Sequence, residues 1–393
     1  MRIVETREQA LFRAEVRDWL ADNVPRETRP PDGLAQRDFD CAWQRRQYDA
    51  GWAGISWPAD YGGRGLPLVE QLIWHEEYAR AAAPPSGAMF IGLSHGGPTL
   101  IVRGSDEQKA RYLPQILMGN EVWCQGFSEP GAGSDLASLR TSAEIDGDHL
   151  VVNGSKIWTT YGIFADQQEL LLRTSRDKPR HKGISWVICD MKSPGIDIRP
   201  IKAMSGYTHF CQVFYDNVRL PLTNVVGEID GGWSVAMATL GFERGTANIA
   251  HQIELARTMD RLVEMAATVP GPGGSGTALN DPAIAADLAR LKADTAALQA
   301  MTAMAISRSM RDSVPGPEGN LVALQFGELV RRVHGFAYTL LGPEALERDG
   351  RYGDLVHEYL DAFKWGIGGG TLEIRRNTIG ERLLGLPKAR DAR

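Results

Sequence analysis

The spacing of apolar residues changes twice along this chain of 393 residues. Residues 1–121 show the three- and four-residue spacing of helices, residues 122–228 show the alternation of strands, and residues 229–393 return to helical spacing. A chain of this length exceeds what one hydrophobic core usually supports. We therefore predict an α+β protein divided at these boundaries into a helical N-terminal domain, a β-rich middle domain and a helical C-terminal domain.

Local signals predict where several elements begin and end. Two capping boxes and one N-cap followed by proline predict helix starts. They are Thr6 with Gln9, Ser105 with Gln108, and Asp281 followed by Pro282. The Asp146-Gly147 pair predicts a tight turn between two strands. The Gly- and Pro-rich residues 270–276 predict a mobile tip between two long helices, and not a domain boundary.

Composition and charge exclude several classes of protein. The formal net charge of −6 is mild and the basic residues are scattered, which argues against nucleic acid or a membrane surface as the main partner. The four cysteines are far apart and form no CxxC pair, so we expect neither a metal site nor a disulfide framework. Charges interrupt the N-terminus and no apolar stretch reaches membrane-spanning length. We expect a cytoplasmic protein without a membrane span.

The segment QGFSEPGAGSDLASLR at residues 125–140 places small residues where a backbone could approach a bulky ligand. Its glycines leave main-chain N–H groups uncovered. Ser128 and Ser134 add hydroxyl groups that can bind phosphate or a heteroaromatic ring. The alternative is that this segment is only an irregular connection between elements.

Three segments, in order, resemble signatures of the acyl-CoA dehydrogenase family. They are residues 125–140, KIWTT at 156–160, and GGTLEIRRNTIGERLLGLP at 369–387. The resemblance covers nearly the whole chain. It implies a helical N-domain, a β-barrel-like middle domain, a C-terminal four-helix bundle and bound FAD. It also implies removal of two hydrogens from an acyl-CoA thioester, with electrons passed to an electron-transferring flavoprotein.

By matching positions, the resemblance assigns residues to the flavin. Ring, ribityl and ADP contacts fall on Gln125, Phe127, Ser128, Gly133, Ser134, Trp158, Thr160, Thr371 and Glu373. An indole offers a broad apolar face to a flat ring, and a threonine hydroxyl can donate to a flavin nitrogen. For Trp158, the alternative is a core residue on an alternating strand.

The resemblance also locates the catalytic base. Many members carry a carboxylate just before the Gly-Thr pair of the C-terminal segment, but this chain has Gly369 there. Others carry it on the helix after the β-domain, and the matching segment LGFERG contains Glu243 and Arg244. We predict Glu243 as the base, with Arg244 orienting it or balancing its charge, and a backbone N–H at Gly369 as an oxyanion donor. Otherwise, Glu243 is an ordinary helix-surface carboxylate.

The assembly and the reaction type stay open at this point. Homotetrameric relatives place an arginine near the flavin diphosphate, but this chain has no arginine between Arg261 and Arg290. A homodimer, a homotetramer and a heterotetramer with a related chain are all compatible with this difference. The rival functions are a flavin oxidase or monooxygenase, a non-catalytic partner subunit, and a dehydrogenase of carrier-protein thioesters.

His95 is a further candidate for lining the site. It lies in the Gly-rich segment GLSHGGPTL, which predicts a turn. A single histidine in a loop is more often structural or exposed to solvent. The sequence contains no HExxH or Walker-type motif, and Gly131-Ala132-Gly133 does not open a strand-to-helix crossover of the dinucleotide-binding kind, so zinc and nicotinamide chemistry are not indicated.

Overall fold

The computed structural model describes residues 5–243, 249–274, 276–312 and 319–387. The chain divides into two compact units, each described by itself. The helical unit contains Met1–Asp18, Leu68–Arg80 and Arg244–Arg393. The sheet unit contains Trp19–Pro67 and Ala81–Glu243.

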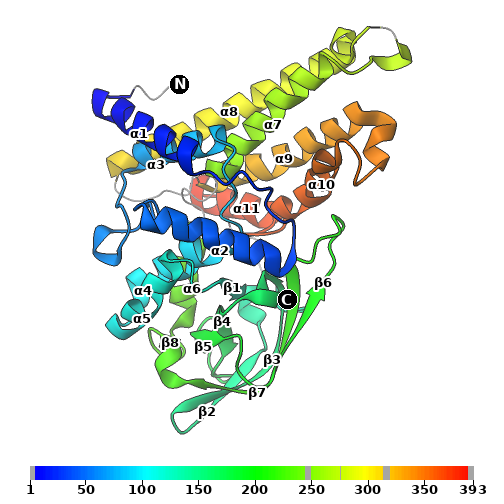
Figure 1. The fold of residues 1–393 in the computed structure, drawn as a ribbon. Coiled ribbons are helices and arrows are strands. Elements are labelled where there is room, and N and C mark those ends of the chain that lie inside the picture. The colour runs from blue at the N-terminus through cyan, green and yellow to red at the C-terminus, as the bar shows by residue number, and fades with distance from the viewer. Residues whose placement is uncertain (1–4, 244–248, 275, 313–318, 388–393) are drawn as a thin grey trace. The chain divides into compact units, whose positions relative to one another are not determined.

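The strands of the described residues form one eight-stranded sheet in the sheet unit (Figure 1). The strands are β1 (Trp123–Gly126), β2 (Ser142–Asp146), β3 (His149–Thr160), β4 (Gln167–Arg173), β5 (Ile184–Asp190), β6 (Ile196–Ile201), β7 (Phe210–Pro221) and β8 (Val225–Val226). They are ordered β6-β7-β3-β2-β4-β5-β8, and β1 pairs in parallel with β4. The long strands β3 and β7 carry bulges near their middle, where register shifts interrupt the pairing.

The two faces of the sheet bury two different hydrophobic clusters. Alternate residues of β4 go to opposite faces, so that Leu170 and Leu172 join one cluster and Leu171 joins the other. The Leu171 cluster also contains Trp123 and Trp186 and is covered by helices. Because β4 is buried along nearly its whole length, any polar side chain on it needs a partner inside the protein.

Helices of the sheet unit pack against this cluster and against one another. They are α2 (Gly33–Asp49), the π-helix η3 (Gly92–Gly96), α4 (Gly97–Arg103), α5 (Asp106–Leu117) and α6 (Gly232–Glu243). Helix α6 contacts η3, α4 and strand β5. The close approach around η3 and α4 requires glycine at position 97, because a Cβ there would lie 2.0 Å from Cζ2 of Trp57.

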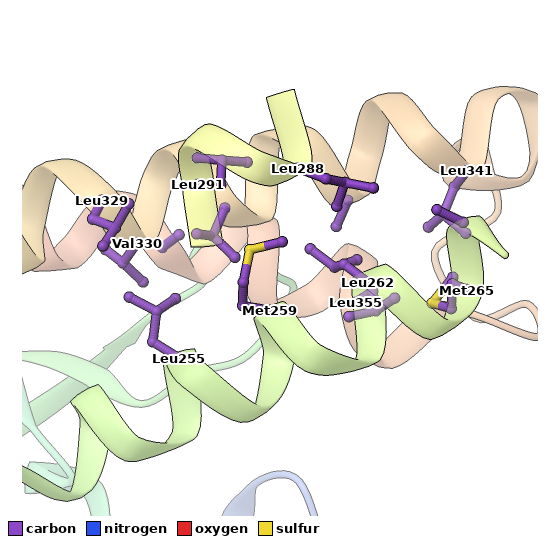
Figure 2. Packing of buried hydrophobic residues seen from close by; sticks show 14 of the residues in the cluster. Leu255, Met259, Leu262, Met265, Leu288, Leu291, Leu329, Val330, Leu341 and Leu355 are labelled. Carbon is purple, nitrogen blue, oxygen red and sulfur yellow. The ribbon is translucent and has the colours of Figure 1, made fainter. Parts of the chain in front are cut away.

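The helical unit has a core of interlocking leucine, valine and methionine side chains. Its helices are α3 (Leu68–Arg80), α7 (Ile249–Ala266), α8 (Pro282–Asp312), α9 (Gly319–Leu341), α10 (Gly353–Asp361) and α11 (Leu372–Thr378), with the first part of α1 (Arg7–Asn23). Figure 2 shows Leu255 and Met259 of α7 facing Leu291 of α8 and Leu329 of α9. No helix in the described ranges is both long and apolar enough to cross a membrane.

Most of the local signals are confirmed. Both capping boxes form, and the Asp281 carboxylate accepts hydrogen bonds from the first turn of α8. The Asp146-Gly147 pair turns between β2 and β3, and residues 270–276 lie between α7 and α8. The fold class is also confirmed, with helices before and after a middle sheet. The two boundaries between the three domains remain a prediction.

An ion-pair network joins α1 to α3 within the helical unit. The Glu77 carboxylate is almost completely buried and lies 2.7 Å from Arg13, 3.0 Å from Arg17 and 2.7 Å from Arg80. Burial alone would raise the pKa of Glu77, but hydrogen bonds from Arg17 and Arg13 bring it below its ordinary value. The carboxylate therefore stabilises the fold at neutral pH, and this contribution is lost when acid protonates it.

Replacing Glu77 by Gln should lower the free energy of unfolding at pH 7 by about 2 kcal/mol, because hydrogen bonds to buried charges are lost. A carboxyl group with a lowered pKa stabilises the fold above its unfolded pKa and stops doing so as pH falls through its folded pKa. The difference between wild type and E77Q should therefore shrink below pH 4, as measured by urea unfolding. Glu76→Gln, at a partly exposed partner of Arg13, is the control with a smaller effect. An E77Q deficit that is independent of pH would contradict this account.

Candidate active site

The first two sequence motifs lie side by side in the sheet unit. The backbone N–H of Ile157 on β3 donates to the carbonyl oxygen of Ser128 at 2.9 Å. The Lys156 ammonium donates to the carbonyl oxygen of Phe127 at 3.1 Å. Glu129 and Ala132 exchange backbone hydrogen bonds of 2.9 and 3.0 Å, which fold the loop into a tight turn. Segments some thirty residues apart in sequence thus form one surface.

Trp158 is presented outward from this surface. Its φ of +62° lies in the left-handed region, which is rarely occupied by a bulky residue, and it sits where the β3–β7 register shifts between Lys156 and Thr159. Its side chain is 57% exposed, and its ring meets Phe210 edge-on at 6.1 Å. The alternative that Trp158 is a core residue is therefore wrong. An exposed indole on strained backbone is typical of a ligand-binding position.

Polar groups beside the indole are available to a ligand. The hydroxyls of Ser128 and Thr160 make no hydrogen bond to any described protein group. A Cβ on Gly131 or Gly133 would meet nothing within 4 Å, so packing does not explain these glycines. Ser134 is exposed in the same loop. The Phe127 side chain, by contrast, is buried in the core, so the ring contact predicted for it would have to come from its backbone.

A buried ion pair holds this loop on β3. The Lys156 side chain is completely buried and its ammonium lies 2.8 Å from the Glu129 carboxylate. Glu129 also accepts from the backbone N–H groups of Arg140 and Thr141 at 2.7 and 2.9 Å. Burial lowers the pKa of Lys156 to about 8, against the opposing effect of Glu129. Burial would raise the pKa of Glu129, but Lys156 and the backbone donors bring it below its ordinary value, so the pair is charged at neutral pH.

Gln125 lies at the start of the same segment, on β1. Its side-chain nitrogen donates to the buried carboxylate of Glu169 at 2.7 Å. His95 lies beside both groups, in the π-helix η3, and is only 3% exposed. The expected turn at His95 is therefore wrong, because the Gly-rich segment packs as helix where its glycines let η3 approach Trp123.

The helix that ends at position 243 is anchored in the sheet unit. The Thr239 hydroxyl on α6 is hydrogen-bonded to the Thr99 hydroxyl on α4 at 2.9 Å, and both residues are completely buried. Glu243 is the last residue of α6. The side chain of Glu243 and the whole of Arg244 lie outside the described residues, so their predicted roles stay predictions.

The third motif lies in the helical unit, where it forms a glycine-rich loop and the start of α11. Gly369 and Gly370 have φ of +66° and +99°, a conformation that favours glycine. The Thr371 hydroxyl accepts from the backbone N–H of Ile374 at 3.3 Å and so caps α11. Arg375 donates to the carbonyl oxygen of Gly368 at 3.0 Å and steadies the loop. Glu373 is exposed on the first turn.

The groups of the sheet unit fit a flat heteroaromatic ring. The exposed indole offers an apolar face for the ring, and the two available hydroxyls can form hydrogen bonds with it. The glycines without a packing role leave space for the ligand. Within the described ranges, no group of three or more His, Cys, Asp or Glu residues could hold a metal ion.

Comparison with known proteins identifies the family. The acyl-CoA dehydrogenase N-terminal, middle and C-terminal domain families match residues 6–120, 124–218 and 230–384. The chain belongs to the acyl-CoA dehydrogenase family, whose members are FAD-dependent oxidoreductases. This confirms the resemblance and the class of enzyme predicted from the three motifs.

Similar proteins include one curated relative and two solved structures. Acyl-CoA dehydrogenase IpdE1 of Mycobacterium tuberculosis strain H37Rv is 40% identical over 386 residues, which cover 96% of this chain and 97% of that protein. The structure described as "Tcur3481-Tcur3483 steroid ACAD" has a TM-score of 0.85 and 30% identity, and covers 99% of this chain and 100% of its own. The ChsE4-ChsE5 complex from M. tuberculosis has a TM-score of 0.83 and 31% sequence identity, and the match covers 99% of this chain and 100% of the chain in that structure.

Sequence reasoning missed the polar residues that support the motifs. Glu129 and Lys156 stand inside the quoted segments, but no role was predicted for either. The available signal was a lysine at an inward position of an alternating strand, where an apolar residue is expected. Glu169 had a similar signal, as an acid directly before the apolar run Leu170-Leu171-Leu172 of the buried strand β4.

Replacing Lys156 by Met should lower the free energy of unfolding by about 3 kcal/mol, because Glu129 would lose its buried counter-charge. Thermal and urea unfolding at pH 7 measure the loss. Lys202→Met, at an exposed lysine of the same unit, is the matched control and should change little. Equal stability of the two variants would show that the buried pair does not hold the loop.

Proposed function

We propose that this chain catalyses the FAD-dependent α,β-dehydrogenation of an acyl-CoA thioester to the trans-2-enoyl-CoA, with an electron-transferring flavoprotein as acceptor. The observation that carries the proposal is the pairing of the Ser128 loop with the outward-facing Trp158 on β3. Family membership supplies the reaction class. The cysteines of the described residues form no disulfide, which is compatible with a location in the cytoplasm.

The residues that would hold FAD come from all three motifs. In the sheet unit they are Gln125, Phe127, Ser128, Gly133, Ser134, Trp158 and Thr160, and in the helical unit Thr371 and Glu373. Bound FAD supplies the hydride acceptor for the β carbon. Trp158 would provide an apolar wall for the ring, and the hydroxyls of Ser128 and Thr160 would orient it through hydrogen bonds.

The proton at the α carbon needs a base of this chain. We assign that role to Glu243, since position 369, where many relatives carry an acid, is glycine. A backbone N–H at Gly369 would donate to the thioester carbonyl oxygen, where negative charge develops as the proton leaves. Arg244 would orient the carboxylate or balance its charge. The buried contact of Thr239 with Thr99 supports this assignment, because it fixes the helix that presents position 243.

Glu243→Gln should slow the anaerobic bleaching of the flavin by acyl-CoA by about 1000-fold, because a carboxamide cannot accept the α proton. Stopped-flow absorbance measures the rate, and an unchanged spectrum of the oxidised flavin shows that the site still forms. Glu228→Gln, at an exposed acid before α6, should bleach at the wild-type rate. Rapid bleaching by E243Q would reject Glu243 as the base.

A narrower function is favoured by the kind of proteins this chain is similar to. Two of the similar structures are described as two-chain proteins, and one of them as a steroid ACAD. This chain also has no arginine between Arg261 and Arg290 to meet the flavin diphosphate. We therefore propose that it acts on a bulky, polycyclic CoA thioester as one subunit of a heterotetramer, in place of a homodimer or homotetramer.

Purified alone, the chain should then hold well below one FAD per chain, because the partner would supply part of the diphosphate site. Absorbance of the flavin against protein concentration measures the ratio, and circular dichroism checks that the chain is folded. A ratio near one FAD per chain, in a particle of uniform mass by light scattering, would favour a homo-oligomer and reject the two-chain assembly.

A further inference from the structure

Gln125 and Glu169 are direct neighbours across the parallel pair β1–β4. They are register partners in the pairing of the two strands. Their immediate neighbours Cys124 and Leu170 point into one hydrophobic cluster, so Gln125 and Glu169 point to the opposite face, which Trp123 and Leu171 share. Their side chains therefore meet on the helix-covered face of the sheet.

The carboxylate of Glu169 determines which way the Gln125 amide points. Glu169 is completely buried, and one of its oxygens lies 2.7 Å from the side-chain nitrogen of Gln125. A carboxylate only accepts hydrogen bonds, so the NH2 group of Gln125 must face it. The carbonyl oxygen of Gln125 then points elsewhere, and it accepts no hydrogen bond from any described residue. The half-buried amide thus offers an acceptor, and not a donor, to a ligand.

His95 closes the cluster from the helix side. Its Nδ1 lies 3.4 Å from the same Glu169 oxygen and 3.3 Å from the Gln125 nitrogen. The ring itself is held edge-on against Phe90 at 5.2 Å. π-helical turns such as η3 occur frequently at functional sites. Both partners of the amide are thus fixed in place.

Stability of the fold alone does not explain why Gln125, Glu169 and His95 lie together. A charged or polar group within an apolar cluster is unfavourable unless it is well paired, and apolar residues of similar volume usually serve stability as well or better. The next residue of β4, Gln168, shows what a structural amide looks like here, because it accepts from the Tyr215 hydroxyl on the other face, within the core. Gln125, in contrast, stands at the start of the loop that carries Ser128.

We propose that Glu169, supported by His95, is a positioning residue that orients the Gln125 amide so that its oxygen accepts from N3–H of the isoalloxazine. This inference rests on the proposed function. The oxidised ring has one N–H, at N3, and its other edge atoms in hydrogen-bonding reach are acceptors. An oriented carbonyl oxygen therefore selects this edge of the ring, whereas a freely rotating amide would not.

The test measures FAD affinity of the apoprotein by quenching of flavin fluorescence, without turnover. Gln125→Leu and Glu169→Leu should each weaken binding about tenfold, which corresponds to one hydrogen bond. The double variant should also be about tenfold weaker, because both changes remove the same bond. Gln168→Leu is the matched control: it also disturbs buried β4, but on the opposite face, and should bind FAD like the wild type.

A conservative variant keeps the proposal testable if Glu169→Leu does not fold. Glu169→Gln retains an oxygen that can accept from Gln125, so FAD affinity should stay within about twofold of wild type. Wild-type affinity in Q125L or E169L, additive losses in the double variant, or equal losses in Q168L would each overturn the positioning role. Failure of the wild-type chain to bind FAD both alone and when assembled with its partner chain would instead overturn the proposed function.

Discussion

The buried ion pair between Lys156 and Glu129 is the interaction on which the sheet unit's candidate site depends. One ammonium group connects β3 to the carbonyl oxygen of Phe127 and to a carboxylate that accepts two further backbone N–H groups. The loop can therefore leave its other polar groups facing outward. Because the pair is buried, its strength is little affected by salt, unlike a surface ion pair.

Polar side chains on the two faces of the sheet have different roles: those on one face stabilise the fold, and those on the other face are proposed to orient the flavin. On one face, the Tyr215 hydroxyl donates to the Gln168 amide oxygen inside a hydrophobic core. On the other face, Glu169 and His95 direct the Gln125 amide toward a position where no described protein group meets its oxygen. The same strand, β4, thus carries a structural amide and a carboxylate that contacts a residue proposed to bind the flavin, separated by the alternation of its side chains.

The local features of the fold could be predicted from sequence because they depend on neighbours along the chain. Capping at Thr6, Ser105 and Asp281 and the turn at Asp146 involve residues only a few positions apart. The turn predicted at His95 was wrong for the opposite reason. The helical conformation around His95 depends on packing against Trp123. Trp123 is distant in sequence, so local sequence patterns do not indicate this contact.

The sequence by itself determined the order of helices and strands, the three motifs and, through them, the family. Short-range spacing and residue type suffice for those features. Only the tertiary structure decided that Trp158 faces outward, that Lys156 is buried against Glu129, and that Glu169 fixes the direction of the Gln125 amide. These outcomes depend on strand register and on a bulge, which bring together residues that no sequence pattern links.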